Sequence, residues 1–170
     1  MSEKRNLIDH YAYWTTEAVK VDLNTKRHDF GVLISNLGND FNIGTVIRSA
    51  NAFLASKVFI YGRRKYDRRG TVGTHHYENL SEINLNQLRN ITDFNLVAID
   101  NVPGATPIES FEWPESPLMM FGQETNGLPP ELLDLAADHV YIKQYGSVRS
   151  LNVGSAASVA MYDWCTKNVQ

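Results

Sequence analysis

Five short apolar runs recur along this chain, and each gives way to a glycine, an amide or a charged residue. The runs cover residues 30–35, 57–61, 94–99, 118–121 and 139–142. Continuous apolar character is typical of strands that are buried on both faces of a sheet. Segments with helical spacing lie between the runs, at residues 85–91 and 131–137. The alternation predicts an α/β fold with a mostly parallel sheet and helices on both of its faces.

The first run leads through a polar turn into a helix. Asn36 and Gly38 belong to the turn, and Asn42 stands where a helix N-cap is expected. Apolar residues at helical spacing follow, namely Ile43, Val46, Ile47 and Ala50. Helical stripes are also expected over residues 7–21 and 151–167, the second rich in small residues that permit close packing. We expect residues 1–29 to form an accessory extension and residues 30–170 to form one domain.

Length and composition set the class of protein. With 170 residues and 43% apolar content, one soluble globular domain is expected. The formal net charge of −3 and the pI near 5.9 argue against a protein that coats nucleic acid through its overall charge. The single cysteine, Cys165, cannot form an intrachain disulfide, and no apolar run is long enough to span a bilayer. Because no signal-peptide pattern is seen near residue 1, we expect a cytoplasmic protein without a membrane partner.

Three polar segments each follow an apolar run, at residues 36–48, 122–127 and 147–152. Ligands of open α/β sheets bind at the carboxyl ends of the strands, where these segments are expected to lie. Arg48 falls on the first turns of the predicted helix, and a guanidinium there can hold a phosphate or a carboxylate. An ion pair on the surface is the alternative explanation for Arg48 taken alone.

The second segment spaces Gly122 and Gly127 around Glu124. Glycine allows a backbone to approach a ligand closely or to enter a left-handed turn, so this loop suits a nucleoside. It lacks the Lys-Ser/Thr ending of a phosphate loop, and no Gly-x-Gly-x-x-Gly follows the first run. Both absences argue against nucleoside triphosphates and dinucleotide cofactors.

The third segment brings Ser150 and Asn152 to the start of the last predicted helix. Ser150 fits an N-cap, and its hydroxyl, with a nearby amide and free N–H groups, also suits a polar cup for a substrate. No histidine stands near Ser150 in sequence to suggest a Ser-His-Asp triad. His75 and His76 would point to opposite sides of a strand, and with no cysteine partners we expect no metal site.

A dense basic run spans residues 63–69, with five positive charges against one negative. The positive residues are Arg63, Arg64, Lys65, Arg68 and Arg69. Such a run can hold a phosphate backbone, and Tyr66 within it can stack on a base. A solvated loop that keeps the protein soluble explains the run equally well.

Taken together, the three polar segments resemble the motifs of the SpoU/TrmH family in the SPOUT superfamily, which are S-adenosylmethionine-dependent RNA ribose 2′-O-methyltransferases. The first motif is matched by Asn36, Gly38, Gly44, Arg48 and Ala50. The second is matched by Gly122, Glu124, Gly127 and Leu128, and the third by Ser150, Leu151, Asn152 and Val153. The resemblance extends from Phe30 to Trp164, and three motifs in order are more specific than any one of them.

The resemblance implies a C-terminal trefoil knot, a homodimer and S-adenosylmethionine as cofactor. The residues expected to contact the cofactor are Ile99, Asp100, Gly122, Gly127, Ile142 and Leu151. Those expected to contact RNA are Asn36, Arg63, Arg64, Lys65, Arg68 and Arg69. No RNA-binding domain of the type seen in some rRNA-directed relatives precedes Phe30, which favours tRNA over rRNA as the substrate.

The expected catalytic residues are Arg48, Glu124, Ser150 and Asn152. The methyl group of a sulfonium is already activated, so the protein mainly has to position the ribose hydroxyl. A charged Arg48 is expected to clamp the adjacent phosphate and stabilise developing negative charge. We expect Ser150 and Asn152 to orient the ribose, and Glu124 to hold Arg48 or its own loop. A non-catalytic RNA-binding or assembly protein with the same fold is the alternative, because the basic run explains binding without chemistry.

Overall fold

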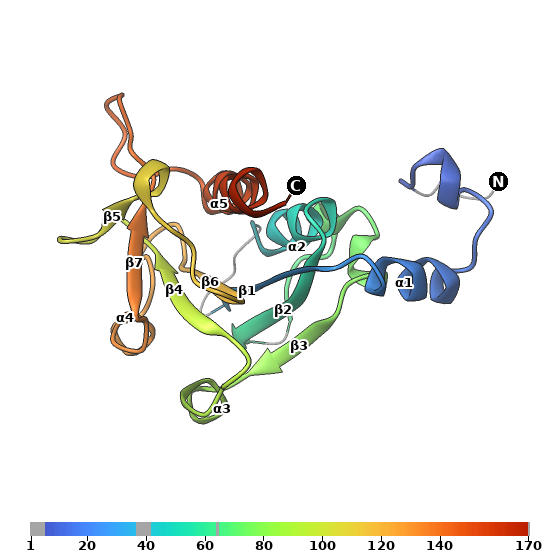
Figure 1. The fold of residues 1–170 in the computed structure, drawn as a ribbon, viewed down its shortest axis with the longest axis horizontal. Helices are drawn as coiled ribbons and strands as arrows, with labels where there is room; N and C mark the ends of the chain where they lie inside the picture. Colours follow the sequence, from blue (N-terminus) through green and yellow to red (C-terminus); the bar gives the residue numbers. More distant parts are fainter. Residues whose placement is uncertain (1–5, 37–41, 64, 170) are drawn as a thin grey trace.

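Parallel strands form one sheet at the centre of the protein (Figure 1). The computed structural model describes residues 6–36, 42–63 and 65–169. Within these residues the sheet has seven strands in the order β3-β2-β1-β6-β4-β7-β5, and neighbouring strands are parallel throughout. The strands are β1 (His28–Asn36), β2 (Ala55–Gly62), β3 (Leu80–Ile83), β4 (Asn95–Ile99), β5 (Thr106–Pro107), β6 (Pro117–Phe121) and β7 (Asp138–Tyr141).

Helices cover both faces of this sheet, with α2 and α5 on one side and α3 and α4 on the other (Figure 1). The α-helices are α1 (Thr16–Asn24), α2 (Asn42–Ala52), α3 (Leu85–Arg89), α4 (Pro130–Leu133) and α5 (Val153–Asn168). Short 3-10 helices are η1 (Asp9–Tyr11), η2 (Arg69–Thr71), η3 (Thr74–His76) and η4 (Ile108–Ser110). The predicted α/β class and the parallel sheet are therefore confirmed, and all five apolar runs are strands.

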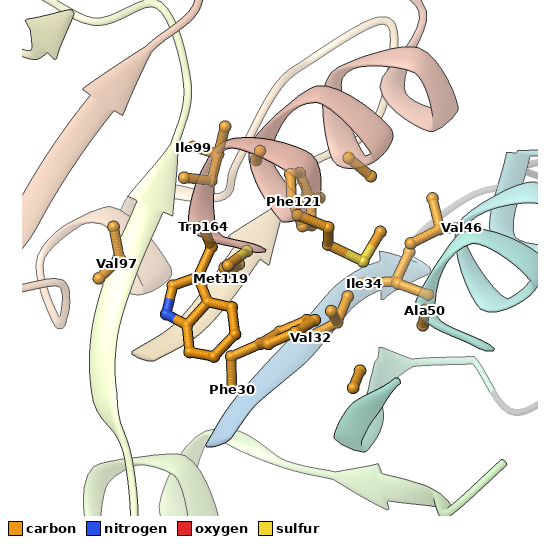
Figure 2. Packing of buried hydrophobic residues seen from close by; sticks show 14 of the residues in the cluster. Phe30, Val32, Ile34, Val46, Ala50, Val97, Ile99, Met119, Phe121 and Trp164 are labelled. Carbon is orange, nitrogen blue, oxygen red and sulfur yellow. The ribbon is translucent and has the colours of Figure 1, made fainter. Parts of the chain in front are cut away.

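Successive residues of β1 point to opposite faces of the sheet, as the pleat requires. Val32 and Ile34 belong to the core under α2 and α5, whereas Leu33 belongs to the core under α3 and α4. Figure 2 shows the first of these cores, where the Trp164 ring of α5 packs against Phe30 with ring centroids 4.8 Å apart. Burial on both faces explains why these strands are continuous apolar runs.

Small residues bring α2 and α5 into close contact, as the composition of the last helix predicted. A Cβ atom added at Gly154 would lie 2.8 Å from the Thr45 side chain. One turn further along, the hydroxyls of Ser49 and Ser158 are hydrogen-bonded at 2.8 Å. The start of α5 is therefore fixed against the start of α2.

The first 29 residues differ from the single predicted helix. The stripe over residues 7–21 is divided into η1 and α1. The break occurs at Thr15, because its side chain caps α1 by accepting a hydrogen bond from the Ala18 N–H at 3.1 Å. Tyr11 and Val19 still pack together with Tyr77 of the main body. The stripe was thus correctly assigned as a packing face but not as a continuous helix.

A buried ion pair also ties this extension to the body. Arg27 donates to both carboxylate oxygens of Glu78 at 2.9 Å, and their side chains are 6% and 0% exposed. Arg27 also donates to the Tyr77 carbonyl at 2.6 Å, and Asn51 donates to Glu78. Removing one member of such a buried pair typically costs about 3–5 kcal/mol, so this contact fixes the chain just before β1.

Three details of the sheet and its helices were not predicted. The strands β3 and β5 were missed because both are short, with β5 only two residues long. The predicted helix at residues 131–137 is shorter and ends at Leu133. Asn42, predicted as an N-cap, is instead the first residue of α2.

Candidate functional site

A cavity of about 410 Å³ opens at the carboxyl ends of β4, β6 and β7, and we call it the first cavity. This volume lies within the range of about 300–1,000 Å³ that is usual for small-molecule sites. Most of its wall comes from the ends of these strands and the residues that follow them: Ile99–Val102 at β4, Phe121–Leu128 at β6, and parts of 141–151 at β7. Leu133 of α4 and Val153 and Ala156 of α5 complete the wall. Segments far apart in the sequence therefore meet at one edge of the sheet. The polar segments at residues 122–127 and 147–152 contribute to the wall, as predicted, whereas the described residues of the segment 36–48 do not.

The loop after β6 is a tight turn that depends on two glycines. Gln123 and Gly127 exchange backbone hydrogen bonds of 3.0 and 2.9 Å, which close the turn. A Cβ atom at Gly122 would lie 2.0 Å from the Gly127 carbonyl carbon, so no side chain fits there. Gly127 has a φ of +65°, in the left-handed region where glycine carries no steric penalty. These requirements explain the spacing of the two glycines without any ligand.

Asp100 joins the three strand ends that form the wall. Its backbone N–H donates to the Val140 carbonyl at 3.0 Å, which links β4 to β7. One carboxylate oxygen accepts from the Leu128 N–H at 2.8 Å, which links β4 to the loop after β6. The other oxygen accepts from the Asn101 N–H at 2.8 Å. Asp100 therefore shapes the cavity, whatever contact it makes with a ligand.

Asn152 connects the loop after β6 to the two packed helices. Its side-chain oxygen accepts from the Ser155 N–H at 3.2 Å and so caps α5. Its Nδ2 group donates to Asn42 Oδ1 at 2.8 Å and also to a carboxylate oxygen of Glu124. The prediction that Ser150 caps the helix is wrong, because Asn152 has that role. Both amide protons of Asn152 are already used by protein groups.

Glu124 was expected to hold Arg48 or its own loop, and it accepts a hydrogen bond from Asn152. Arg48 lies on α2, is exposed, and makes no hydrogen bond or ion pair with other residues in the described part of the chain. It is absent from the wall of the first cavity. The expected pairing of Glu124 with Arg48 is therefore not seen, and the Arg48 guanidinium is free to meet an external anion.

The position of Arg48 follows from its neighbours on α2. Gly44, four residues earlier, touches the backbone of Gly70, since a Cβ atom there would lie 2.9 Å from it. Thr45 and Ser49 face α5. At 100° per residue, Arg48 falls between these two faces. Its side chain thus emerges between the segment that ends in η2 and the helix that begins at the first cavity.

The structure brings the predicted cofactor-binding residues and two of the predicted catalytic residues to one place. The six residues predicted to bind the cofactor all line the first cavity, as do Glu124 and Ser150. Asn152 is outside the wall but is hydrogen-bonded to Glu124. Arg48 is neither part of the wall nor bonded to Glu124. Gln144 and Arg149 also line the cavity and were missed by sequence reasoning. The signal that could have identified them is their place in the polar segment between the last strand, β7, and the last helix, α5.

The basic segment, residues 63–69, lies apart from the first cavity. Arg63, Lys65 and Arg68 are exposed, and Arg64 lies outside the described residues. Arg69 is also exposed, but Asp67 accepts hydrogen bonds from its backbone and side-chain N–H groups at 2.5–3.0 Å. These bonds lower the pKa of the Asp67 carboxyl and raise the pKa of Arg69. One of the five predicted cations is therefore paired within the segment.

Two residues predicted to meet RNA have other surroundings. Asn36 is 0% exposed, so it makes no surface contact; its Nδ2 group donates to the carbonyls of Arg63 at 2.5 Å and Lys65 at 3.2 Å. The prediction of direct contact is wrong because Asn36 ends a buried strand, where its side chain holds the backbone of the basic segment. Tyr66 packs partly against the core, and this burial raises the pKa of its hydroxyl.

His75 and His76 lie on η3, so the prediction that they would alternate on a strand is wrong. Their rings are 4.0 Å apart. Nδ1 of His75 is 2.7 Å from the Thr71 hydroxyl, and burial is the main cause of its lowered pKa. No group of three or more histidine, cysteine, aspartate and glutamate side chains suited to a metal ion occurs among the residues described.

The model of the SpoU rRNA methylase family matches residues 29–162 of this chain. The chain belongs to this family. A tRNA (guanosine(18)-2′-O)-methyltransferase from Aquifex aeolicus is 22% identical over 150 residues, which cover 83% of this chain and 71% of that protein. The predicted SpoU/TrmH resemblance is thus confirmed.

Solved SpoU structures share the fold. An AdoMet-bound rRNA methyltransferase from Sinorhizobium meliloti matches with a TM-score of 0.73 at 22% identity, over 87% of this chain and 61% of that one. The SpoU methyltransferase AviRb from Streptomyces viridochromogenes, in complex with AdoMet, matches with a TM-score of 0.72 at 25% identity, over 85% of this chain and 60% of that one. This SpoU family member therefore spans about 60% of the length of those two proteins.

None of the helices in the described ranges combines the length and apolar character needed to cross a bilayer.

Proposed function

We propose that this SpoU family member transfers the methyl group of S-adenosylmethionine to a ribose 2′-hydroxyl of RNA. One observation carries the proposal: the segments after β4, β6 and β7 enclose a single cavity of about 410 Å³. Family membership supports the same activity. Relatives named as tRNA and rRNA methyltransferases support RNA as the substrate.

The first cavity fits the cofactor chemically. Its wall combines apolar side chains suited to an adenine ring, such as Ile99, Ile142 and Leu151, with polar groups at Asp100 and Gly127. We infer that these residues, together with Gly122, hold S-adenosylmethionine. The cofactor supplies an electrophilic methyl group, whose bond to sulfur breaks with the electron pair remaining on sulfur. The protein holds the donor in place and shields it from water.

Arg48 is proposed to act as a charged clamp. A guanidinium with no protein partner in the described residues can fork onto a phosphate next to the target ribose. It also stabilises the negative charge that develops on the hydroxyl oxygen. Ser150, on the wall of the first cavity, is suited to orient the ribose, while Asn152 and Glu124 keep the loop after β6 against α5.

Several finer features belong to the same proposal. We propose tRNA as the substrate, with the basic segment gripping its backbone, and the name of the Aquifex relative supports this choice. A C-terminal trefoil knot is supported by the return of the chain from β7 to α5, which packs on α2. A homodimer is supported by exposed Val159 and Tyr162 on α5. A cytoplasmic location and a division into extension (1–29) and domain (30–170) complete the proposal.

The experiment uses S-adenosylmethionine labelled on its methyl group, with total tRNA and total rRNA as separate substrates. We expect label in tRNA at one nucleotide whose 3′ linkage resists alkaline hydrolysis, because a 2′-O-methyl group removes the internal nucleophile. Arg48→Ala should abolish transfer without changing the affinity for S-adenosylhomocysteine, and Arg89→Ala, on α3, is the matched control. Transfer at a normal rate by Arg48→Ala would refute its assignment.

The exposure of Arg63, Lys65 and Arg68 favours a second candidate, an RNA-binding or assembly protein without catalysis. The same assay separates the two functions. RNA binding without incorporation of label into either RNA pool would support the second candidate.

A further inference from the structure

A second cavity of about 380 Å³ adjoins the first. It is lined by Asn101, Tyr141, Ile142, Lys143, Gln144, Gly146, Val148 and Arg149. The two cavities share a wall of five residues, Asn101, Tyr141, Ile142, Gln144 and Arg149. Except for Asn101, which follows β4, this wall lies at the end of β7 and in the segment between β7 and α5, which projects beyond the sheet (orange-red in Figure 1). Ile142 of this lining is also proposed to contact the cofactor, whereas Lys143, Gln144 and Arg149 have no part in the proposed function.

The charges of the second cavity favour an anion. Lys143 and Arg149 contribute two positive charges, and no aspartate or glutamate is present in the lining. Arg149 is exposed and makes no ion pair or hydrogen bond within the described residues. Among the residues that the structure describes, Lys143 contacts only the Tyr145 ring, with its Nζ atom 5.4 Å from the ring centroid. A guanidinium and an ammonium at one opening are the groups that bind phosphodiesters.

The shared wall contains a polar atom in need of a partner. The side-chain oxygen of Gln144 is buried and has no hydrogen-bond partner in the described part of the chain. An unsatisfied buried acceptor costs about 1–3 kcal/mol. A rotation of the carboxamide toward either cavity relieves this cost if a ligand supplies a donor there. The acceptor thus lies between the place proposed for the methyl donor and a cationic opening.

We propose that the second cavity receives the RNA nucleotide that is methylated, an inference that rests on the proposed function. Lys143 and Arg149 hold one of the two phosphates that flank its ribose, which leaves the other to Arg48, and the Gln144 oxygen accepts a hydrogen bond from the ribose 2′-hydroxyl. The ribose oxygen then bonds to the methyl carbon as the carbon–sulfur bond breaks, sulfur keeps the electron pair, and the hydroxyl proton passes to water. Gln144 is a neutral acceptor that orients the hydroxyl and takes no proton.

The test compares Lys143→Gln and Arg149→Gln with Arg89→Gln, which removes one exposed positive charge near the amino end of β4. Affinity for S-adenosylhomocysteine is measured by calorimetry without RNA. Affinity for total tRNA is measured by filter binding over a range of salt concentrations, with S-adenosylhomocysteine saturating. We expect Lys143→Gln and Arg149→Gln each to weaken tRNA binding roughly tenfold and to reduce the salt slope by about one. Their affinity for S-adenosylhomocysteine should stay within about twofold of wild type, and Arg89→Gln should change neither.

Gln144→Leu tests the hydroxyl contact separately. It should lower the rate of methyl transfer at saturating tRNA roughly tenfold, which is the expected effect of losing one positioning contact. The salt slope of tRNA binding should not change, because no charge is removed. An unchanged transfer rate would overturn the role of Gln144.

Two outcomes overturn the assignment of the second cavity. If Arg149→Gln weakens S-adenosylhomocysteine as strongly as tRNA, the cavity serves the methyl donor. If tRNA affinity and salt slope are unchanged in both charge variants while wild type still methylates tRNA, only this inference fails. If wild type binds S-adenosylhomocysteine but neither tRNA nor rRNA, the proposed function fails with it.

Discussion

The first cavity and the basic segment differ in how their residues are brought together. The first cavity joins three segments distant in sequence, and backbone hydrogen bonds through Asp100 and the Gln123–Gly127 pair fix its shape. The basic segment is one continuous run held by a buried amide, Asn36. Precise geometry suits a site that must align a reacting group, whereas a charged run suits contacts with a phosphate backbone. Substitutions should therefore have steep effects in the cavity and graded effects in the basic segment.

The largest effect is expected for Gly122→Ala. The added Cβ would lie 2.0 Å from the Gly127 carbonyl carbon and 2.2 Å from the Leu128 nitrogen, so the turn has to open. A cost of about 3 kcal/mol for the strain corresponds to roughly 100-fold weaker binding of S-adenosylhomocysteine. Calorimetry measures the loss. Gly146→Ala is the matched control, because a Cβ there meets nothing within 4 Å; similar affinities in the two variants would contradict the role of the turn.

An intermediate effect is expected for Asn36→Ala, which leaves every charge in place. Losing the buried hydrogen bonds should lower the free energy of unfolding by about 1–3 kcal/mol. The affinity for total tRNA should fall roughly threefold to tenfold, because the basic segment then loses its anchor and must be ordered on binding. Denaturant unfolding and filter binding measure the two effects. Asn90→Ala, which removes an exposed amide on the C-cap of α3, should change neither; unchanged tRNA affinity in Asn36→Ala would show that the anchor is dispensable.

The smallest effect is expected for Asp67→Asn, and its sign is opposite. The substitution removes the carboxylate that engages Arg69, so this guanidinium becomes available to a phosphate. Affinity for total tRNA should rise roughly twofold to fivefold, and the salt slope should steepen by about one. Asp93→Asn makes the same charge change at an exposed residue before β4 and serves as control. Equal gains in the two variants would assign the effect to net charge alone.

The sequence was most informative where one physical cause acts locally. Residues 30–35 have to be apolar throughout because β1 is central and both of its faces are covered, so the run predicts its own strand. Gly122 and Gly127 signal a turn because no other residue fits them. The polar segments after the strands predicted a site at one edge of the sheet, and the residues named for the cofactor line the same cavity.

Elsewhere the sequence allowed more than one arrangement. Ser150 and Asn152 are both good N-cap residues, and only the position at which α5 starts decides between them. Asn36 follows an apolar run in the same way that Asp100 does, yet it is fully buried while Asp100 lines the cavity. Exposure at a strand end depends on which loops cover it, and this information is not local. The pairing of Glu124 with Asn152 could not be predicted for the same reason, because it depends on how two distant segments approach each other.

The backbone of Gly44 contacts the backbone of Gly70, so no side chain lies between α2 and the residue that follows the basic segment. Because two backbones in direct contact leave little room for relative movement, a displacement of the basic segment would also displace α2. If a polyanion binds Arg63, Lys65 and Arg68 as proposed, a shift of the basic segment would be passed to the helix that carries Arg48. Binding of a large substrate at the basic segment would then determine the orientation of the Arg48 guanidinium.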